Sequence, residues 1–352
     1  MALGVSPAAP ARQAEIPFRR GTRQHFDLVG DIPYVSNRAG TPRRLNQVGF
    51  LAGVLVHVTG TLTLGAGGAA TADAPWALIR RLRLTLNTGV TVYDVSGFGA
   101  FIANFLIKEE FAANSSGLAQ VFAAPNVPAG ANVWSFLLWI PVAANDGQNF
   151  EVGLINLQTE ELIAQVEIDW APETDVTTSA TPAFVGRADV HAEWYEVPDP
   201  RIVRFPPLNV LHRIIEDRQP INGTGDNRKA LLRQGTLLQL AHIVRLNGAR
   251  NTVDVVALRL ELNRSDRVYR YLLAPQLWFQ AMRYGQDLPV GVFAWDWWHS
   301  QMDVSQGDGR DFVDTEAIAQ IDSVVDIAAA AVLGANNNFL DSIRRFTQVL
   351  IP

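Results

Sequence analysis

The chain has 352 residues, of which 48% are hydrophobic and 18% are charged, and its formal net charge is −6. This length suits two β-domains of about 150 residues each, and the apolar content excludes disorder for most of the chain. The acidic balance disfavours nucleic-acid binding, and the lack of cysteine excludes disulfides, thiolate metal sites and cysteine nucleophiles.

Residues 1–44 are predicted to form an N-terminal arm. The segment holds seven arginines against three acidic residues, a local balance of +4, and Arg12, Arg19, Arg20 and Arg23 are the first four of these arginines. A flexible solvated tail and a contact arm both agree with this charge pattern.

Two segments of the chain repeat each other. Leu82–Asp94 has the sequence LRLTLNTGVTVYD, and Leu258–Arg270 has the sequence LRLELNRSDRVYR. The two segments align without a gap, position 82 with position 258, and the distance along the sequence between them is half the length of the chain. Alternating leucines, a turn at Asn87 and a second alternating stretch are typical of a β-hairpin. We therefore infer that one module occurs twice.

The flanking sequence repeats as well. Apolar residues at helical spacing in 98–106 and 273–282 predict one short amphipathic helix after each hairpin. Upstream, alternating apolar strands are expected at 50–64 and 236–246. Their offset is 186, ten residues more than the offset between the hairpins, and the longer loop 65–75 of the first copy accounts for this difference.

Downstream of each helix, an aromatic-rich strand is expected at 134–142 and at 290–298. The apolar stretch 133–144 is too short to cross a bilayer. Four prolines between 198 and 207 indicate an extended linker. We therefore expect a first domain over 45–200 and a second over 201–352.

These patterns predict an all-β fold of two tandem eight-stranded jelly rolls, each with a short helix. Together with the segment Leu138–Trp170, they resemble the double jelly-roll major capsid proteins of tailless icosahedral bacteriophages with an internal membrane, the tectivirus and corticovirus type. The resemblance implies a virion protein with no catalytic site and no cofactor. It also implies homotrimers that form pseudo-hexagonal tiles of an icosahedral shell.

The resemblance further implies partners. These are other copies of the chain within and between trimers, penton or minor capsid proteins, and internal membrane lipid or a neighbouring subunit touched by Arg12, Arg19, Arg20 and Arg23. Sequence-specific nucleic-acid binding is not expected.

A bicupin metalloenzyme is the main alternative, because cupins are also tandem β-sandwiches. The histidines disfavour it, since they include no His-x-His pair and no glutamate at ligand spacing. His57 and His242 lie in equivalent strands but one residue out of register, which places them on opposite faces. The six histidines are His25, His57, His191, His212, His242 and His299.

Three weaker candidates complete the sequence-based picture. Asp303, Asp308 and Asp311 could bind Ca²⁺, although a plain turn is favoured because the first copy has a similar Asp-Gly loop. Asp296 and His299 are close in sequence, but no nucleophile-elbow motif accompanies them. A carbohydrate-binding protein would need exposed aromatic side chains such as Trp76 or Trp278. A viral spike protein is a further alternative, because it too can be a trimeric β-sandwich.

Overall fold

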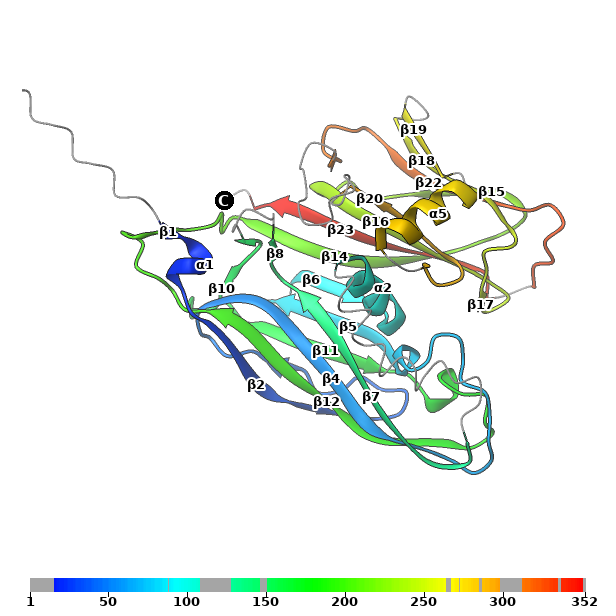
Figure 1. The fold of residues 1–352 in the computed structure, drawn as a ribbon, viewed down its shortest axis with the longest axis horizontal. Coiled ribbons are helices and arrows are strands. Elements are labelled where there is room, and N and C mark those ends of the chain that lie inside the picture. Colours follow the sequence, from blue (N-terminus) through cyan, green and yellow to red (C-terminus); the bar gives the residue numbers. More distant parts are fainter. Residues whose placement is uncertain are drawn as a thin grey trace, which may run out of the picture.

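The structure is a computed structural model that describes residues 16–87, 89–107, 128–145, 151–263, 267–271, 273–284, 287–297, 312–334 and 337–350. These residues form two β-sandwiches, and Figure 1 shows them side by side with one helix between them. The main strands of each sandwich form two sets of four with the same strand order, so the expected pair of eight-stranded jelly rolls is confirmed.

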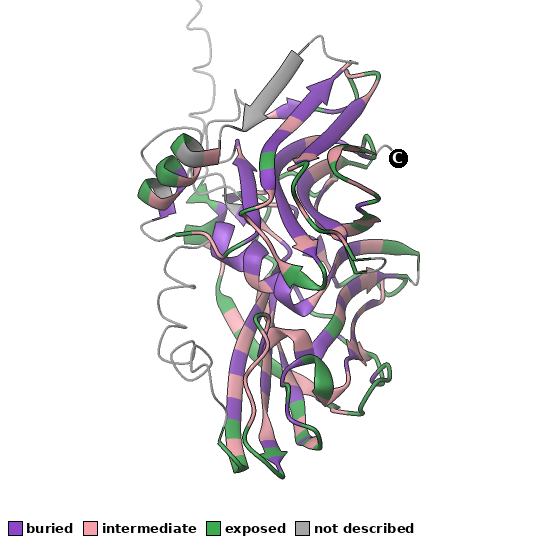
Figure 2. Ribbon diagram, turned by 90° about the vertical axis from the view of Figure 1, so that its right-hand side faces the viewer, coloured by how far each residue is buried: buried purple, intermediate pink, exposed green. Residues whose placement is uncertain are grey.

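The outer sheet of the first roll carries the longest strands of the chain. Alternate residues such as Val54, Val56 and Val58 are buried in the core, whereas Leu55 and His57 face outward and are half-buried. Figure 2 shows this alternation as changing colours along the strands. The strands, in sheet order, are β2 (Gln24–Pro33), β12 (Pro182–Tyr195), β4 (Phe50–Leu64) and β7 (Gly130–Pro141).

The second sheet of the first roll contains the repeated hairpin. Leu82, Leu84 and Leu86 are buried and face the core, as their period of two predicts. Two residues, Ile155–Asn156 (β10), extend the outer sheet beside the start of β4. The strands of the second sheet, in order, are β3 (Arg43–Arg44), β11 (Ala164–Trp170), β5 (Ile79–Leu86) and β6 (Val90–Val95).

The second roll repeats both sheets strand for strand. Its first sheet has the order β14 (Val210–Pro220), β23 (Phe339–Val349), β16 (Thr236–Leu246) and β20 (Val292–Asp296). Its second sheet has the order β15 (Gly225–Ala230), β22 (Ile321–Ile327), β18 (Val255–Leu262) and β19 (Arg267–Tyr271). Strand β18 begins half a chain length after the beginning of β5 and ends half a chain length after the end of β5, as the sequence repeat requires.

The duplication extends to irregularities of the backbone. Asn87 and Asn263 both have positive φ, and the side-chain oxygen of each accepts a 2.7 Å hydrogen bond, from the backbone N–H of Ile163 and of Ala319 respectively. A β-bulge skips Ala52 in β4 and Leu238 in β16, at the same offset that relates the two strands in the sequence. The two rolls can therefore be compared residue by residue.

One main helix follows the hairpin of each roll, at the position that the spacing of apolar residues predicts. These helices are α2 (Gly97–Ile107) and α5 (Leu273–Tyr284). Shorter elements are α1 (Phe18–Gly21), η1 (Trp76–Leu78), η2 (Glu173–Asp175), β8 (Ala144–Asn145), β9 (Glu151–Val152), β17 (Ala249–Arg250) and β21 (Val313–Asp314).

The expected N-terminal arm of residues 1–44 is too long. Residues from Gln24 onward belong to the first roll, because β2 pairs along β12 and β3 pairs with β11. Alternation is hard to read in β2, where Phe26 and Leu28 are exposed instead of buried. The chain is already attached before β2, because β1 (Ile16–Pro17) pairs in parallel with β13 (Val203–Arg204) in the linker between the rolls.

We expect core truncation to have similar effects in the two rolls. Leu84→Ala and Leu260→Ala each remove a fully buried side chain, and each should cost about 2–5 kcal/mol of stability. The midpoint of thermal unfolding measures the effect. Leu232→Ala, at a side chain that is 61% exposed, is the matched control and should change the midpoint little. A large cost at only one of the two core positions would contradict their equivalence.

Candidate functional site

Helix α2 joins the two rolls. Nine of its 11 residues are buried, and its side chains pack both on the first roll and on the outward face of the sheet β14–β23–β16. A small cavity between helix and sheet is lined by Ala103 and Leu106 on one side and by Ile214, Ala241 and Ile343 on the other. The edge strands β6 and β14 also pair in parallel, which makes one sheet continuous through both rolls. The helix is therefore the apolar centre of the contact between the rolls.

Polar groups of the second roll hold both ends of α2. At its beginning, the hydroxyl of Ser96 accepts a hydrogen bond from the N–H of Gly99 (3.0 Å) and donates one to Glu216 (3.1 Å). At its end, the carbonyl of Leu106 accepts a 3.1 Å hydrogen bond from the Gln239 amide. Burial and the nearby Asp341 raise the pKa of Glu216.

A buried arginine lies under the last turn of α2. Arg345 donates from Nε to Nε2 of His212 (2.8 Å) and from Nη1 to Oε1 of Gln239 (2.9 Å). Burial lowers the pKa of Arg345 to about 10, so the guanidinium remains charged at neutral pH. Burial and this charge keep the pKa of His212 well below its usual value, which suits Nε2 as an acceptor while Nδ1 contacts the carbonyl of Pro141 (3.1 Å).

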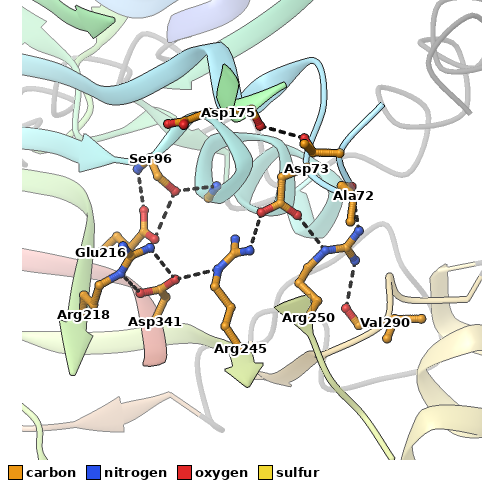
Figure 3. Close-up of polar contacts among 12 residues, drawn as sticks. Ala72, Asp73, Ser96, Asp175, Glu216, Arg218, Arg245, Arg250, Val290 and Asp341 are labelled. Carbon is orange, nitrogen blue, oxygen red and sulfur yellow. Dashed lines mark hydrogen bonds and ion pairs between the residues drawn. The ribbon is translucent and has the colours of Figure 1, made fainter. Parts of the chain in front are cut away.

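A network of ion pairs closes one side of the same contact (Figure 3). Asp73 of the first roll binds Arg245 and Arg250 of the second, the latter at 2.7 Å, and all three side chains are less than one fifth exposed. Asp341, which is fully buried, accepts from Arg218 (2.6 and 3.0 Å) and Arg245 (3.2 Å). Since Asp73 lies in the loop before η1, this loop is part of the contact between the rolls.

The histidines do not form a metal site in the described part of the chain. No group of three or more His, Cys, Asp or Glu residues there could hold a metal ion. His57 is half-buried on the outward face of β4 and contacts the hydroxyl of Ser135 at 2.8 Å. His242 is buried inside the second roll between Ser323 (2.7 Å) and Ser342 (3.0 Å), and burial lowers its pKa to about 3. The two side chains therefore occupy opposite faces of equivalent strands.

The remaining predicted residues fall into three groups. Asp303, Asp308, Asp311, His299 and Arg12 lie outside the described residues. Arg19, Arg20 and Arg23 are exposed at the end of the molecule where β1 meets β13. Of the two tryptophans considered for carbohydrate binding, Trp76 stacks on Phe101 at a centroid distance of 3.8 Å, whereas Trp278 is 68% exposed.

Sequence reasoning missed the contact between the rolls. The available signal is the unusual number of charged residues in two core strands, β14 (VLHRIIEDRQP) and β23 (FLDSIRRFTQV). Charged side chains in buried strands need partners. Glu216 and Arg213 find theirs in the first roll, at Ser96 and at the carbonyl of Thr91. Asp341 and Arg344 pair within the second roll, with Arg218 and Asp217 respectively.

No protein-family model and no curated protein matches this sequence. Solved structures do resemble the chain. The MCP of STIV (Sulfolobus turreted icosahedral virus) has a TM-score of 0.71 at 14% identity, covering 93% of this chain and 97% of that one. The PBCV-1 virus capsid has a TM-score of 0.63 at 13% identity (94% and 95% covered). The major capsid protein P2 of bacteriophage PM2 has a TM-score of 0.55 at 13% identity (93% and 98% covered).

These similarities cover both rolls and establish the double jelly-roll fold of the chain. Among the helices that the structure describes, none has the length and hydrophobicity needed to cross a membrane.

The ion pairs of Asp73 should contribute strongly to the stability of the joined rolls. Asp73→Ala leaves Arg250 without a carboxylate and Arg245 with only Asp341, at a cost of about 3 kcal/mol. Denaturant titration measures this cost. Asp226→Ala is the control, because Asp226 pairs with Arg259 at the surface, where such pairs contribute under about 1 kcal/mol. Equal effects of the two substitutions would show that the contact between the rolls does not depend on Asp73.

Proposed function

We propose that this chain is a viral major capsid protein whose homotrimers tile an icosahedral shell. The observation that carries the proposal is the strand-for-strand repetition of both sheets in the two halves, in a fold shared with the MCP of STIV and the major capsid protein P2 of PM2. Three chains with two similar rolls each supply six similar units, which suits a pseudo-hexagonal tile. The role is structural and not catalytic.

The interior of each roll supports a structural role. In a cupin the metal lies inside the barrel, but here buried apolar side chains fill both interiors. Trp170, Leu82 and Val56 belong to the first core, and Phe293, Leu258 and Val325 belong to the second. Inside the second roll, His242 lies within hydrogen-bond distance of the hydroxyls of Ser323 and Ser342. A carbohydrate-binding or spike protein remains the second candidate because of the exposed Trp278.

Solution mass tests this proposal. The purified chain should have three times its monomer mass of 38.6 kDa in light scattering, and electron-microscope images should show particles with a hexagonal outline. Addition of zinc, iron or manganese salts should not change its thermal stability. A monomer that binds one of these metals would contradict the proposal and favour the bicupin.

We also propose that the end of the molecule at β1 and β13 faces anionic lipid. Arg19, Arg20 and Arg23 are exposed there, and Arg204 lies opposite Pro17 in the β1–β13 pair. Ile16 and Ile202 lie beside them and are 39% and 48% exposed, so positive charge and apolar surface occur together. This combination is typical of surfaces that contact lipid headgroups. Penton or minor capsid proteins are further proposed partners.

Vesicle sedimentation tests the lipid contact. The chain should bind vesicles that contain phosphatidylglycerol and should bind pure phosphatidylcholine much more weakly. Arg19→Glu with Arg20→Glu should weaken this binding about tenfold or more, because each basic residue at an anionic surface contributes roughly 1 kcal/mol. Arg38→Glu with Arg80→Glu, at exposed positions elsewhere on the first roll, makes the same charge change and should leave binding nearly intact. Equal losses for both pairs would rule out a specific lipid-facing end.

A further inference from the structure

The two equivalent helices differ sharply in exposure. Ile102, Ala103 and Leu106 of α2 are buried, each at most 5% exposed. Their counterparts half a chain length later are Trp278, Phe279 and Met282 of α5, which are 68%, 38% and 53% exposed. Trp278 and Met282 are thus far more exposed than Ile102 and Leu106, which occupy the same positions of the helix in the first roll.

The cover of α2 is the outward face of a sheet in the other roll. Ala103 and Leu106 line one cavity with Ile214, Ala241 and Ile343, which come from β14, β16 and β23. The face of α5 that corresponds to this contact is large and apolar. Exposed apolar patches of this kind mark interaction sites.

The first roll has a counterpart of that covering face. In the second roll, the first row of cross-strand partners after the bulge at Leu238 consists of Ile214, Arg345 and Gln239. In the first roll, the first row after the equivalent bulge at Ala52 consists of Phe26, Glu193 and Gly53. By this register, the counterparts of Ile214, Ala241 and Ile343 are Phe26, Leu55 and His191.

This counterpart face is accessible. Phe26 and the nearby Leu28 are 52% and 60% exposed, and the ring of Phe26 stacks on His191 at a centroid distance of 5.1 Å. Figure 1 shows that β2, β12 and β4 lie on the side of the first roll away from the second, so α5 does not reach this face within one chain. A second copy of the chain can bring an α5 to it.

The polar pair at the start of α2 has an apolar counterpart. Within the chain, Ser96 at the start of α2 binds Glu216. The register makes Leu28 the counterpart of Glu216, and the sequence has leucine at 272, the counterpart of Ser96 and a residue outside the described part. A polar pair in one contact thus corresponds to two leucines in the other. Leu28 therefore adds to the apolar surface beside Phe26.

We propose that α5 of one copy docks on the outward face of β2, β12 and β4 of a second copy, with Trp278, Phe279 and Met282 against Phe26, Leu28 and Leu55. The inference rests on the proposed function and adds the surfaces that hold the trimer together. The contact joins two different surfaces, so it closes into a ring when repeated by a threefold rotation. The edge strands β19 and β2 then correspond to β6 and β14, which pair within the chain.

Disulfide trapping tests the contact directly, because the natural chain has no cysteine. Leu106 and Ile214 line the same cavity, and their counterparts are Met282 and Phe26. A chain with Met282→Cys and Phe26→Cys should form covalent dimers and trimers on mild oxidation, visible on a non-reducing gel. The matched control combines Met282→Cys with Val253→Cys, at a side chain that is 92% exposed, and should stay mostly monomeric.

Charge substitution gives an independent measurement. Trp278→Arg and Phe26→Arg should each weaken trimer formation about tenfold or more in a dilution series, while Val253→Arg should not. Circular dichroism checks that each variant is folded, and the two substitutions lie on different rolls, so a folding defect in one leaves the other informative. A trimeric wild-type chain whose folded Trp278→Arg and Phe26→Arg variants remain trimeric would overturn the docking proposal alone. A wild-type chain that is monomeric at all concentrations would overturn the proposed function as well.

Discussion

The contact between an apolar helix and the outward face of a β-sheet determines how this molecule is organised. A sheet at the surface normally presents polar residues outward, but β14, β23 and β16 present Ile214, Ile343 and Ala241 and bury them beneath α2. Because both rolls have the same strand order, each has one such helix and one such sheet. A single chain joins the helix of its first roll to the sheet of its second, which leaves one helix and one sheet uncovered.

The polar residues around this contact determine which sheet α2 packs on. Glu216 and Gln239 hold the two ends of α2, and Asp73 binds two arginines at its side. In the first roll, the register places Leu28 and Gly53 at the positions of Glu216 and Gln239. Docking α2 on the sheet of a first roll would therefore leave Ser96 without its carboxylate. Unpaired buried polar groups are costly, so the two contacts do not exchange partners easily.

The sequence predicts those features that depend on local patterns. The alternation of Leu82, Leu84 and Leu86 predicts β5, the repeat half a chain length later predicts β18, and the spacing of Phe98, Phe101 and Phe105 predicts α2. The strand β2 escapes prediction because its outward face carries Phe26 and Leu28, which conceal the alternation. The ion pairs of Asp73 escape because their partners, Arg245 and Arg250, come from the other half of the chain and no motif marks either side. The alignment of the two strands does predict the different places of His57 and His242, because a difference of one residue turns one side chain outward and buries the other.

Joining two rolls in one chain settles which contacts form first. The linker keeps the second roll at high effective concentration beside α2, so the helix of the first roll meets its own sheet before that of another copy. The face that contains Ile214 is then occupied, whereas Trp278 of α5 and Phe26 of the outward sheet of the first roll remain exposed. Each chain consequently offers one uncovered helix and one uncovered sheet on different rolls. A contact between two different surfaces repeats head to tail, so the proposed docking gives a closed ring of alternating first and second rolls if each step is a threefold rotation.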